Sequence, residues 1–305
     1  MEKDTNSKTA ADCGDENRIS PDICGNEGAF AEEDTAKRAE ESLRKRFRKK
    51  LFSRFAKAIT EYNLISEGDK IAVCMSGGKD SFVMAKLFQE LKRHNKFPFE
   101  LVFLVMDPGY SPINRERIEK NAALLNIPVT VFETDIFESV FEIEKSPCYI
   151  CARMRRGHLY HAAKDLGCNK IALGHHYDDV IETVLMGMLY GGQIQTMMPK
   201  LKSANFEGME LIRPMYLIRE EHIKQWRDAN GLEFLSCACK FTEKAAQNCS
   251  DAGKRLKVKE LIRRLEAEEG GIEQNIFRSV ENVSLKSVIA YKDKQGVKHR
   301  FDEDY

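Results

Sequence analysis

Long apolar runs are missing from this sequence of 305 residues. No stretch approaches the ~18 apolar residues of a membrane-spanning helix, and the first residues lack the apolar segment that a signal peptide needs. We therefore expect a cytoplasmic protein with no membrane partner. In a reducing compartment, its nine cysteines are expected to be thiols, metal ligands or catalytic groups rather than disulfides. A hydrophobic content of 42% suffices for a full-sized core and excludes a wholly disordered chain.

Net charge is also absent, because 48 basic residues balance 48 acidic ones, but the two signs are unevenly distributed. Residues 1–35 hold ten acids and three bases, which predicts a disordered acidic tail. In residues 36–66 we expect a basic helix over 36–62, whose apolar side chains recur at every fourth position. These side chains are Leu43, Phe47, Leu51 and Phe55. The basic face is either an ordinary solvated surface or a binding surface for a polyanion such as a nucleic acid.

Short apolar segments alternate with helical segments between residues 67 and 240. The predicted strands cover residues 71–75, 101–106, 129–132 and 170–173. The predicted helices cover residues 81–94, 114–125, 151–166 and 178–190. This alternation predicts an α/β fold with a doubly wound parallel sheet. Because ligands in such sheets bind beyond the carboxyl ends of the strands, the loops that begin at Ser76, Met106 and Gly174 should form the site.

The rest of the chain gives weaker signals. Residues 191–215 are expected to form a loop or a hairpin, and helices are expected at about 220–229 and 253–269. Residues 241–305 are treated as a C-terminal extension, in which residues 287–291 are the single strand candidate.

A glycine-rich loop, Ser76-Gly77-Gly78-Lys79-Asp80-Ser81, lies between the first predicted strand and its helix. Glycine lets backbone N–H groups converge on an anion, and the start of a helix adds the positive end of its dipole. The carboxylate of Asp80 would need a cation between itself and a phosphate, and Mg²⁺ is the natural choice. Neither the Walker A spacing nor the Rossmann glycine pattern is present. The sequence therefore predicts a phosphate loop of another kind.

A CxxC pair, Cys148 and Cys151, is followed far downstream by Cys237 and Cys239. The pair alone fits a redox dithiol, half of a zinc site or part of an iron–sulfur site. All four thiols would suit zinc, whereas three thiols on a [4Fe–4S] cluster would leave one iron open for a sulfide or a substrate. An arginine cluster centred on Arg155 follows the pair and is expected to bind phosphates of ATP or RNA.

Several segments resemble those of one known family. The loop Ser76–Ser81 is similar to the PP-loop of the N-type ATP pyrophosphatases. Three further segments resemble those of tRNA 2-thiocytidine synthetases: Cys148-Tyr-Ile-Cys-Ala-Arg-Met-Arg-Arg-Gly157, Leu173-Gly-His-His-Tyr-Asp-Asp-Val-Ile-Glu-Thr183 and Tyr190-Gly-Gly-Gln-Ile-Gln-Thr-Met-Met-Pro-Lys200. In that family ATP is cleaved between its α and β phosphates, and AMP is transferred to an oxygen of the substrate. The resemblance implies an ATP-dependent tRNA sulfurtransferase.

The resemblance also implies which residues carry the reaction. Those expected to bind ATP are Ser76, Gly77, Gly78, Lys79, Asp80, Ser81, Met106, Arg155, Gly174 and Asp179. Those expected to act in catalysis are Asp80, Asp179, Cys148 and Cys151. A [4Fe–4S] cluster is expected on Cys148, Cys151 and Cys237. The family has a second CxxC where this chain has Cys237-Ala-Cys239, so Cys239 is the alternative third ligand.

The implied reaction is thiolation at C2 of a tRNA base, expected to be a cytidine in the anticodon loop. ATP with Mg²⁺ would activate the C2 oxygen by adenylation, and sulfur would then displace AMP. The expected partners are tRNA, a sulfur donor such as a cysteine desulfurase, and a second copy of the chain in a homodimer. Two alternatives remain open. One is a PP-loop enzyme that acts on another tRNA base or a small molecule and has structural zinc, and the other is a non-catalytic metal-binding RNA chaperone.

Overall fold

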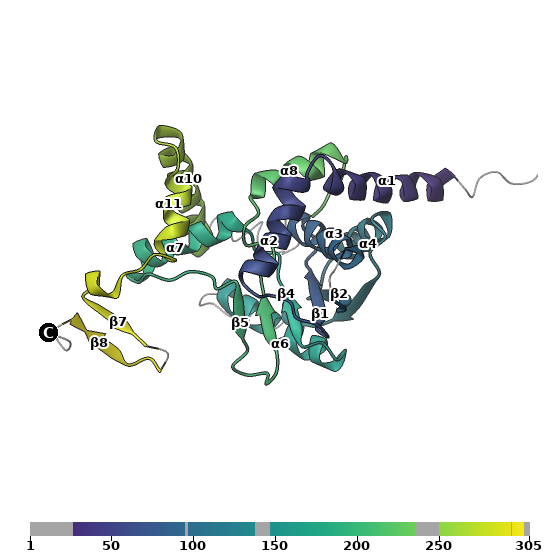
Figure 1. Ribbon diagram of the computed structural model, residues 1–305. Coiled ribbons are helices and arrows are strands. Elements are labelled where there is room, and N and C mark those ends of the chain that lie inside the picture. Colours follow the sequence, from purple (N-terminus) through teal and green to yellow (C-terminus); the bar gives the residue numbers. More distant parts are fainter. Residues whose placement is uncertain (1–26, 95–96, 138–146, 236–249, 294, 302–305) are drawn as a thin grey trace, which may run out of the picture.

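The computed structural model describes residues 27–94, 97–137, 147–235, 250–293 and 295–301. Its centre is a six-stranded sheet in the order β3-β2-β1-β4-β6-β5 (Figure 1). The strands are β1 (Lys70–Met75), β2 (Glu100–Asp107), β3 (Val129–Glu133), β4 (Lys170–Ala172), β5 (Lys200–Lys202) and β6 (Glu210–Ile212). Within this sheet β5 pairs antiparallel with β6, and the other neighbours are parallel. The predicted α/β fold is confirmed, and the segment expected as a loop or hairpin supplies one edge of the sheet.

The direction of winding reverses at β1. From β1 the chain passes outward through β2 to β3 and then returns to β4, which pairs with the opposite side of β1. Ile71 is therefore aligned with Leu101 on one side and with Lys170 on the other. A crevice forms at such a reversal, beyond the carboxyl ends of the two strands, because the connections leave them in opposite directions. The loops after Met75 and Ala172 meet at this crevice.

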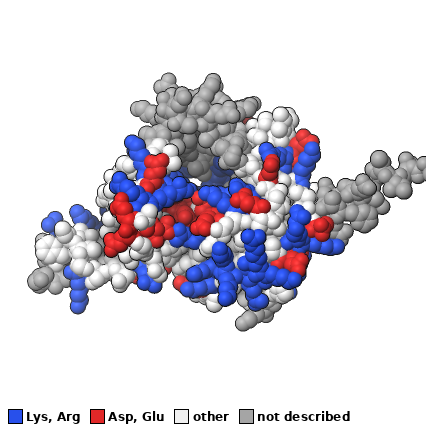
Figure 2. Space-filling model, turned by 90° about the horizontal axis from the view of Figure 1, so that it is seen from above, with Lys and Arg blue, Asp and Glu red and all other residues white. Residues whose placement is uncertain are grey.

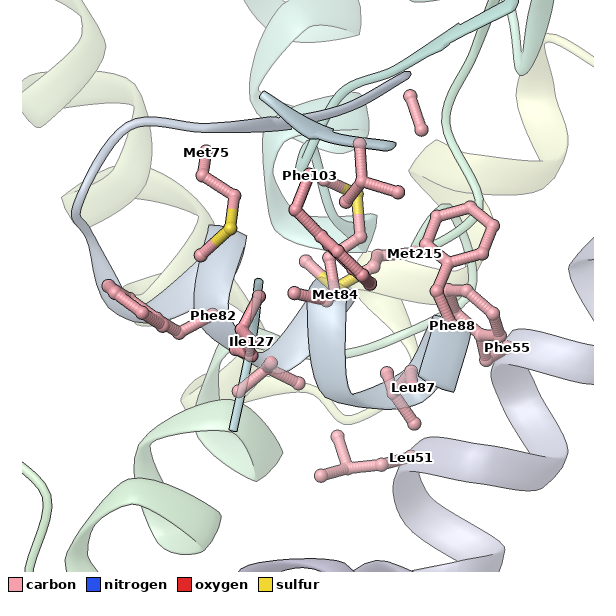
Figure 3. Close-up of a cluster of buried hydrophobic side chains, with 14 of the residues drawn as sticks. Leu51, Phe55, Met75, Phe82, Met84, Leu87, Phe88, Phe103, Ile127 and Met215 are labelled. Carbon is pink, nitrogen blue, oxygen red and sulfur yellow. The ribbon is translucent and has the colours of Figure 1, made fainter. Parts of the chain in front are cut away.

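Helices cover both faces of the sheet. They include α3 (Lys79–Arg93), α4 (Pro112–Leu124) and α6 (Pro147–Asp165). On one face, Phe82 and Phe88 of α3 belong to the same buried cluster as Phe103 of β2 (Figure 3). On the other face, Tyr160 and Ala163 of α6 pack with apolar residues of β1, β2 and β4. Coverage on both faces explains why the strands appear in the sequence as unbroken apolar runs.

The basic N-terminal segment forms two helices rather than the single predicted one. Helix α1 (Glu27–Arg44) is followed by a π-helical turn at Arg48–Phe52 and by α2 (Ser53–Glu61). Four residues advance about 400° around an α-helix, so a strict four-residue repeat drifts off one face. The wider π turn offsets this drift, and the four repeated side chains stay at most 2% exposed.

The start of α1 also corrects the predicted boundary of the acidic tail. Residues 27–35, which the charge pattern assigned to the tail, belong to α1. Ala36, next to them, is buried, so the helix is stabilised by packing that the acidic composition did not indicate. The remaining tail, residues 1–26, lies outside the described residues.

Three further helices pack beside α2. They are α7 (Tyr177–Gly191), α10 (Ser250–Glu268) and α11 (Ile272–Ser279). They share a buried cluster that includes Val180, Val258 and Phe277. The helix α8 (Glu220–Ala229) packs on α3 instead. The sequence did not indicate α11, and none of the helices in the described ranges is long and apolar enough to cross a membrane.

The end of the chain forms a small hairpin that lies apart from the main sheet (Figure 1). After a 3-10 turn at Leu285–Ser287, β7 (Ala290–Lys292) pairs antiparallel with β8 (Lys298–Arg300). The strand predicted over 287–291 is thus displaced toward β7, and its partner strand was missed. Three-residue strands are too short to show a period of two in the sequence.

One buried ion network fastens α1 to α3. The Lys86 ammonium on α3 is fully buried and donates hydrogen bonds to Glu40 Oε1 (2.7 Å), Gln89 Oε1 (2.7 Å) and the carbonyl of Leu125 (2.9 Å). Glu40 also accepts a hydrogen bond from Arg93. Burial disfavours the charged form of Glu40, but the hydrogen bonds from Arg93 and Lys86 outweigh burial and lower its pKa below the ordinary 4.5.

Replacing Glu40 by Gln should lower the free energy of unfolding by about 3 kcal/mol, because the buried ammonium of Lys86 loses its countercharge. Since the pKa of Glu40 is lowered in the folded protein, this difference should be present above pH 4.5 and disappear as the pH falls through the folded pKa. Urea unfolding at a series of pH values measures both effects. The control is Glu41→Gln at an exposed carboxylate that pairs with Lys45, and it should leave stability nearly unchanged. Equal losses in the two variants would contradict the prediction.

Candidate active site

The predicted phosphate loop leaves the end of β1 and leads directly into α3. Gly77 has φ +83°, and a Cβ there would lie 2.7 Å from Ile118 Cγ1 and 2.9 Å from Leu235 Cδ1. Only glycine fits this position without displacing both neighbours. Gly78 is the N-cap residue of α3, has an extended backbone and accepts the N–H of Ser81 (3.2 Å). The N–H groups before Ser81, at the start of the helix, remain for an anion. Ser81 Oγ donates to the carbonyl of Gly78 (2.8 Å).

Lys79 and Asp80 form the charged part of the loop. Lys79 Nζ lies 3.0 Å from Asp80 Oδ2 and 3.1 Å from Glu220 Oε1. Burial disfavours the charged form of Lys79, but the two carboxylates outweigh burial and raise its pKa. The other oxygen, Asp80 Oδ1, is buried and has no hydrogen-bond partner among the described residues. An unsatisfied buried carboxylate oxygen is costly, and a bound cation would satisfy it.

The loop after β4 brings a second carboxylate to the same place. Gly174 lies against the phosphate loop, where a Cβ would be in van der Waals contact with the carbonyl carbon of Asp80 at 3.5 Å. His176 then serves as the N-cap residue of α7, and its backbone N–H donates to Asp179 Oδ2 (3.0 Å). The His176 ring lies between the carboxylates, with Nε2 3.9 Å from Asp80 Oδ1 and Nδ1 3.5 Å from Asp179 Oδ2. The structure thus brings Gly174 and Asp179 to the loop, as the sequence predicts.

The two adjacent histidines add polar atoms to the site. Burial lowers the pKa of His175 to about 4, so its ring is neutral near pH 7. Burial opposes the charge of Asp179, but the neighbouring imidazoles and Arg255 hold its pKa below the ordinary value. In the part of the chain that the structure describes, Nδ1 of His175 and Nδ1 of His176 are buried without a hydrogen-bond partner. Together with Asp80 Oδ1, these atoms are available to a polar ligand.

Asp178 has a different position from its neighbour. Its Oδ2 accepts the backbone N–H of Glu220 (2.8 Å) and lies 3.7 Å from Arg219 Nε. Asp178 therefore holds the start of α8 and lines a polar cavity of about 280 Å³ beside the loop. The role expected for Asp179 at the nucleotide stays a prediction.

Helix α10 of the C-terminal extension supplies cations that the sequence argument missed. Arg255 Nε lies 3.0 Å from Glu182 Oε2, and Arg255 Nη2 lies 3.7 Å from Asp179 Oδ1. Lys259 Nζ lies 2.7 Å from Glu220 Oε2. Figure 2 shows such interleaving on one face of the molecule, where acidic side chains lie among Lys and Arg. The sequence predicts a basic helix over about 253–269, but neither its charge nor the one-turn spacing of the two cations reveals what the helix faces.

The end of β2 meets the start of α6 on the other face of the sheet. Met106 is buried in an apolar cluster with Ile136, and Cys151 and Met154 of α6 pack against this cluster. The end of β2, where Met106 is expected to bind ATP, is therefore next to the CxxC helix. Arg155 is half-buried on the same helix, and the structure does not test its predicted contact with ATP.

The predicted cluster ligands are only partly described by the structure. Cys148 and Cys151 are one turn apart near the start of α6, which places them on one side of the helix. The side chain of Cys148 and all of Cys237 and Cys239 lie outside the described residues. Among the side chains that are described, no three of His, Cys, Asp or Glu are arranged to hold a metal ion. The ligand set therefore stays a prediction.

The segment that leads to Cys237 is attached to the phosphate loop. The backbone N–H of Leu235, two residues before Cys237, donates to the carbonyl of Gly77 (3.1 Å). The preceding Phe234 ring stacks on Phe82 of α3, with ring centroids 4.8 Å apart. The chain that leads to Cys237 is therefore in contact with the predicted phosphate loop at Leu235.

Comparison with known proteins places these features in one family. Residues 43–249 match the family model described as the PP-loop domain. The chain is 37% identical over 235 residues to the tRNA-cytidine(32) 2-sulfurtransferase of Alcanivorax borkumensis. This alignment covers 75% of this chain and 78% of that protein. It is 36% identical over 236 residues to the enzyme of the same name from Pelobacter propionicus, in an alignment that covers 76% of this chain and 85% of that protein.

The fold has a counterpart among solved structures. The U34-tRNA thiolase NcsA from Methanococcus maripaludis, solved with its [4Fe-4S] cluster, aligns with a TM-score of 0.58 at 23% identity, over 82% of this chain and 78% of that one. This likeness supports the fold, whereas the family match and the sequence relatives cover the phosphate loop and the CxxC pair as well. The chain therefore belongs to the PP-loop family, in the group of the tRNA-cytidine(32) 2-sulfurtransferases.

Proposed function

We propose that this protein is an ATP-dependent tRNA thiolase that replaces the C2 oxygen of a cytidine in the anticodon loop with sulfur. The observation that carries the proposal is the junction of two sites. Leu235 is hydrogen-bonded to Gly77 of the phosphate loop, two residues before Cys237, and Cys151 packs beside the end of β2. A nucleotide site and a thiol site at one edge of the sheet are what activation of an oxygen followed by sulfur transfer requires. The names of the sequence relatives support the same reaction.

The loop Ser76–Ser81 would hold the pyrophosphate part of ATP through its backbone N–H groups. Mg²⁺ fits beside Asp80, whose buried Oδ1 lacks a partner among the described residues, and when bound it would offset the charge of the phosphates. Lys79, which Asp80 and Glu220 hold in place, adds a fixed positive charge. Asp179 is kept ionised by the groups around it and would help to position the nucleotide. The remaining predicted ATP contacts are Met106, Arg155 and Gly174.

The proposed reaction has two steps. The C2 oxygen of the base attacks the α-phosphorus of ATP, the bond from that phosphorus to the β-phosphate breaks, and pyrophosphate leaves. A sulfide then attacks C2, the bond from C2 to the adenylated oxygen breaks, and AMP leaves with that oxygen. The loop stabilises charge in the first step, when negative charge develops on the departing pyrophosphate. The target base must leave its stack to reach these groups, which suits a base in a single-stranded loop.

A [4Fe–4S] cluster on Cys148, Cys151 and Cys237, with Cys239 as the alternative third ligand, would supply an open iron that holds the sulfide. Among these thiols the structure describes the surroundings of Cys151, which is half-buried against the apolar cluster of Met106. Such surroundings restrict water on that side of the thiol. We also propose that a cysteine desulfurase or a similar protein donates the sulfur. The enzyme would act in the cytoplasm as a homodimer.

Asp80→Asn should lower the tRNA-dependent release of pyrophosphate from ATP by about 10²-fold or more, because the variant loses the charge that would hold a cation at the phosphates. The assay uses the purified protein with Mg²⁺, ATP and an unmodified tRNA transcript. Asp228→Asn is the matched control, since it removes a carboxylate with a 62% exposed side chain on α8, and it should keep full activity. A rate for Asp80→Asn within twofold of the wild type would remove Asp80 from the mechanism.

Cys148→Ala and Cys151→Ala should each abolish thionucleoside formation while the protein stays folded and binds ATP. Mass spectrometry of tRNA nucleosides from anaerobically grown cells measures thiolation, and circular dichroism of the purified variants measures folding. Cys168→Ala is the control, because Cys168 is buried just beyond the end of α6 that lies away from the CxxC pair, and it should keep thiolation. Unfolding of the CxxC variants would indicate structural zinc, and loss of a thiouridine in place of 2-thiocytidine would change the substrate base.

A further inference from the structure

A groove that the proposed reaction does not use lies between α6 and the hairpin of β5 and β6. Its volume is about 740 Å³. Residues of α6 from Ile150 to Tyr160 line one side, and residues 201–206 of the hairpin line the other. The phosphate loop and the loop after β4 contribute no residue to its lining. The groove is therefore a separate feature of the surface.

The charged side chains that line this groove are all positive. Arg153 and Arg156 of α6 and Lys202 of β5 are exposed along it, and no Asp or Glu from the described ranges lines it. Three cations without a lining carboxylate produce a local positive potential. The ligand that such a surface fits best carries several negative charges.

The interior of the groove is apolar and aromatic. The rings of Tyr160 and Phe206 are stacked, with centroids 5.1 Å apart and an angle of 14° between the planes. Tyr160 is buried, whereas Phe206 is half-buried and borders the groove. Met154 and the exposed Leu201 add apolar surface beside them. Cations around an aromatic interior fit a ligand that combines phosphate with a planar ring, which is the chemistry of a nucleotide.

The groove begins next to the CxxC pair. Ile150, at one end of the lining, directly precedes Cys151. Tyr160 lies ten residues further along α6, which corresponds to about 15 Å at 1.5 Å per residue. A strand of nucleic acid in the groove would therefore run from the thiol site along the helix.

We propose that this groove binds the single-stranded RNA that flanks the target base of the tRNA substrate, with the three cations at phosphates and one base near the aromatic pair. The inference rests on the proposed function and assigns it a substrate surface. A free nucleotide and an RNA strand share the same chemistry, a phosphate with a planar base. The cations, however, lie on both α6 and β5 rather than around one point. This distribution suits a chain of phosphates rather than a single one.

The test measures binding of an unmodified tRNA transcript to the full-length protein at several salt concentrations. The triple variant Arg153→Gln, Arg156→Gln, Lys202→Gln should raise the Kd at least about tenfold and lower the slope of log Kd against log salt by about 2, since each phosphate contact to a single strand contributes about 0.7. Binding of a fluorescent ATP analogue should stay unchanged, because none of the three side chains belongs to the phosphate loop.

The control triple removes the same charge from exposed positions outside the groove. Its substitutions are Lys164→Gln, Lys257→Gln and Arg264→Gln, of which the first lies on α6 itself, and it should change the Kd less than about twofold. Equal weakening by both triples would overturn the inference, because the attraction would then be general. A wild-type Kd for the groove triple would also overturn it and would leave the groove to an acidic protein partner. Absence of thionucleoside formation by the wild-type enzyme would count against the proposed function instead.

Discussion

The site depends on the parallel pairing of β1 with β2 on one side and with β4 on the other. Because the chain leaves β1 and β4 in opposite directions, their loops emerge side by side at the carboxyl edge of the sheet. Gly174 therefore lies against the backbone of Asp80, where a Cβ would be in ordinary van der Waals contact at 3.5 Å. The same contact brings Asp179 and Asp80 to either side of the His176 ring. Strand order thus determines where these groups lie.

This arrangement concentrates carboxylates where phosphates are expected, and such a site requires cations. Glu220 illustrates the balance: burial disfavours its charge, but Lys259, Lys224 and Lys79 together hold its pKa well below the ordinary value. A buried carboxylate left without these partners would be strongly unfavourable. Lys259 belongs to α10, which follows the part of the chain that matches the family model. The extension therefore takes part in the charge balance of the core domain, although its described residues add no strand to the main sheet.

The sequence predicts the features that are local. The loop from Ser76 to Ser81 could be recognised because its glycines and the start of its helix are neighbours along the chain, and the first four strands could be recognised from their apolar runs. The pairing of Arg255 with Glu182 could not, because it arises from the packing of α10 on α7 and no local pattern encodes that contact. The π turn, α11 and β8 were missed, and β5 and β6 were expected only as a loop or a hairpin, because packing rather than periodicity determines them. The cluster ligands rest on the family resemblance, and the structure describes only part of them.

Gly77 is part of the predicted phosphate loop and is also in contact with the chain that leads to Cys237. Its backbone is part of the loop that would surround a phosphate, and its carbonyl also accepts the N–H of Leu235. The space left by its missing side chain is filled by Leu235 and Ile118. A displacement of the loop when a nucleotide enters or leaves would therefore be transmitted through one hydrogen bond to the chain that leads to Cys237. A redesign of the loop for another anion would therefore have to keep the Gly77 carbonyl in place for Leu235.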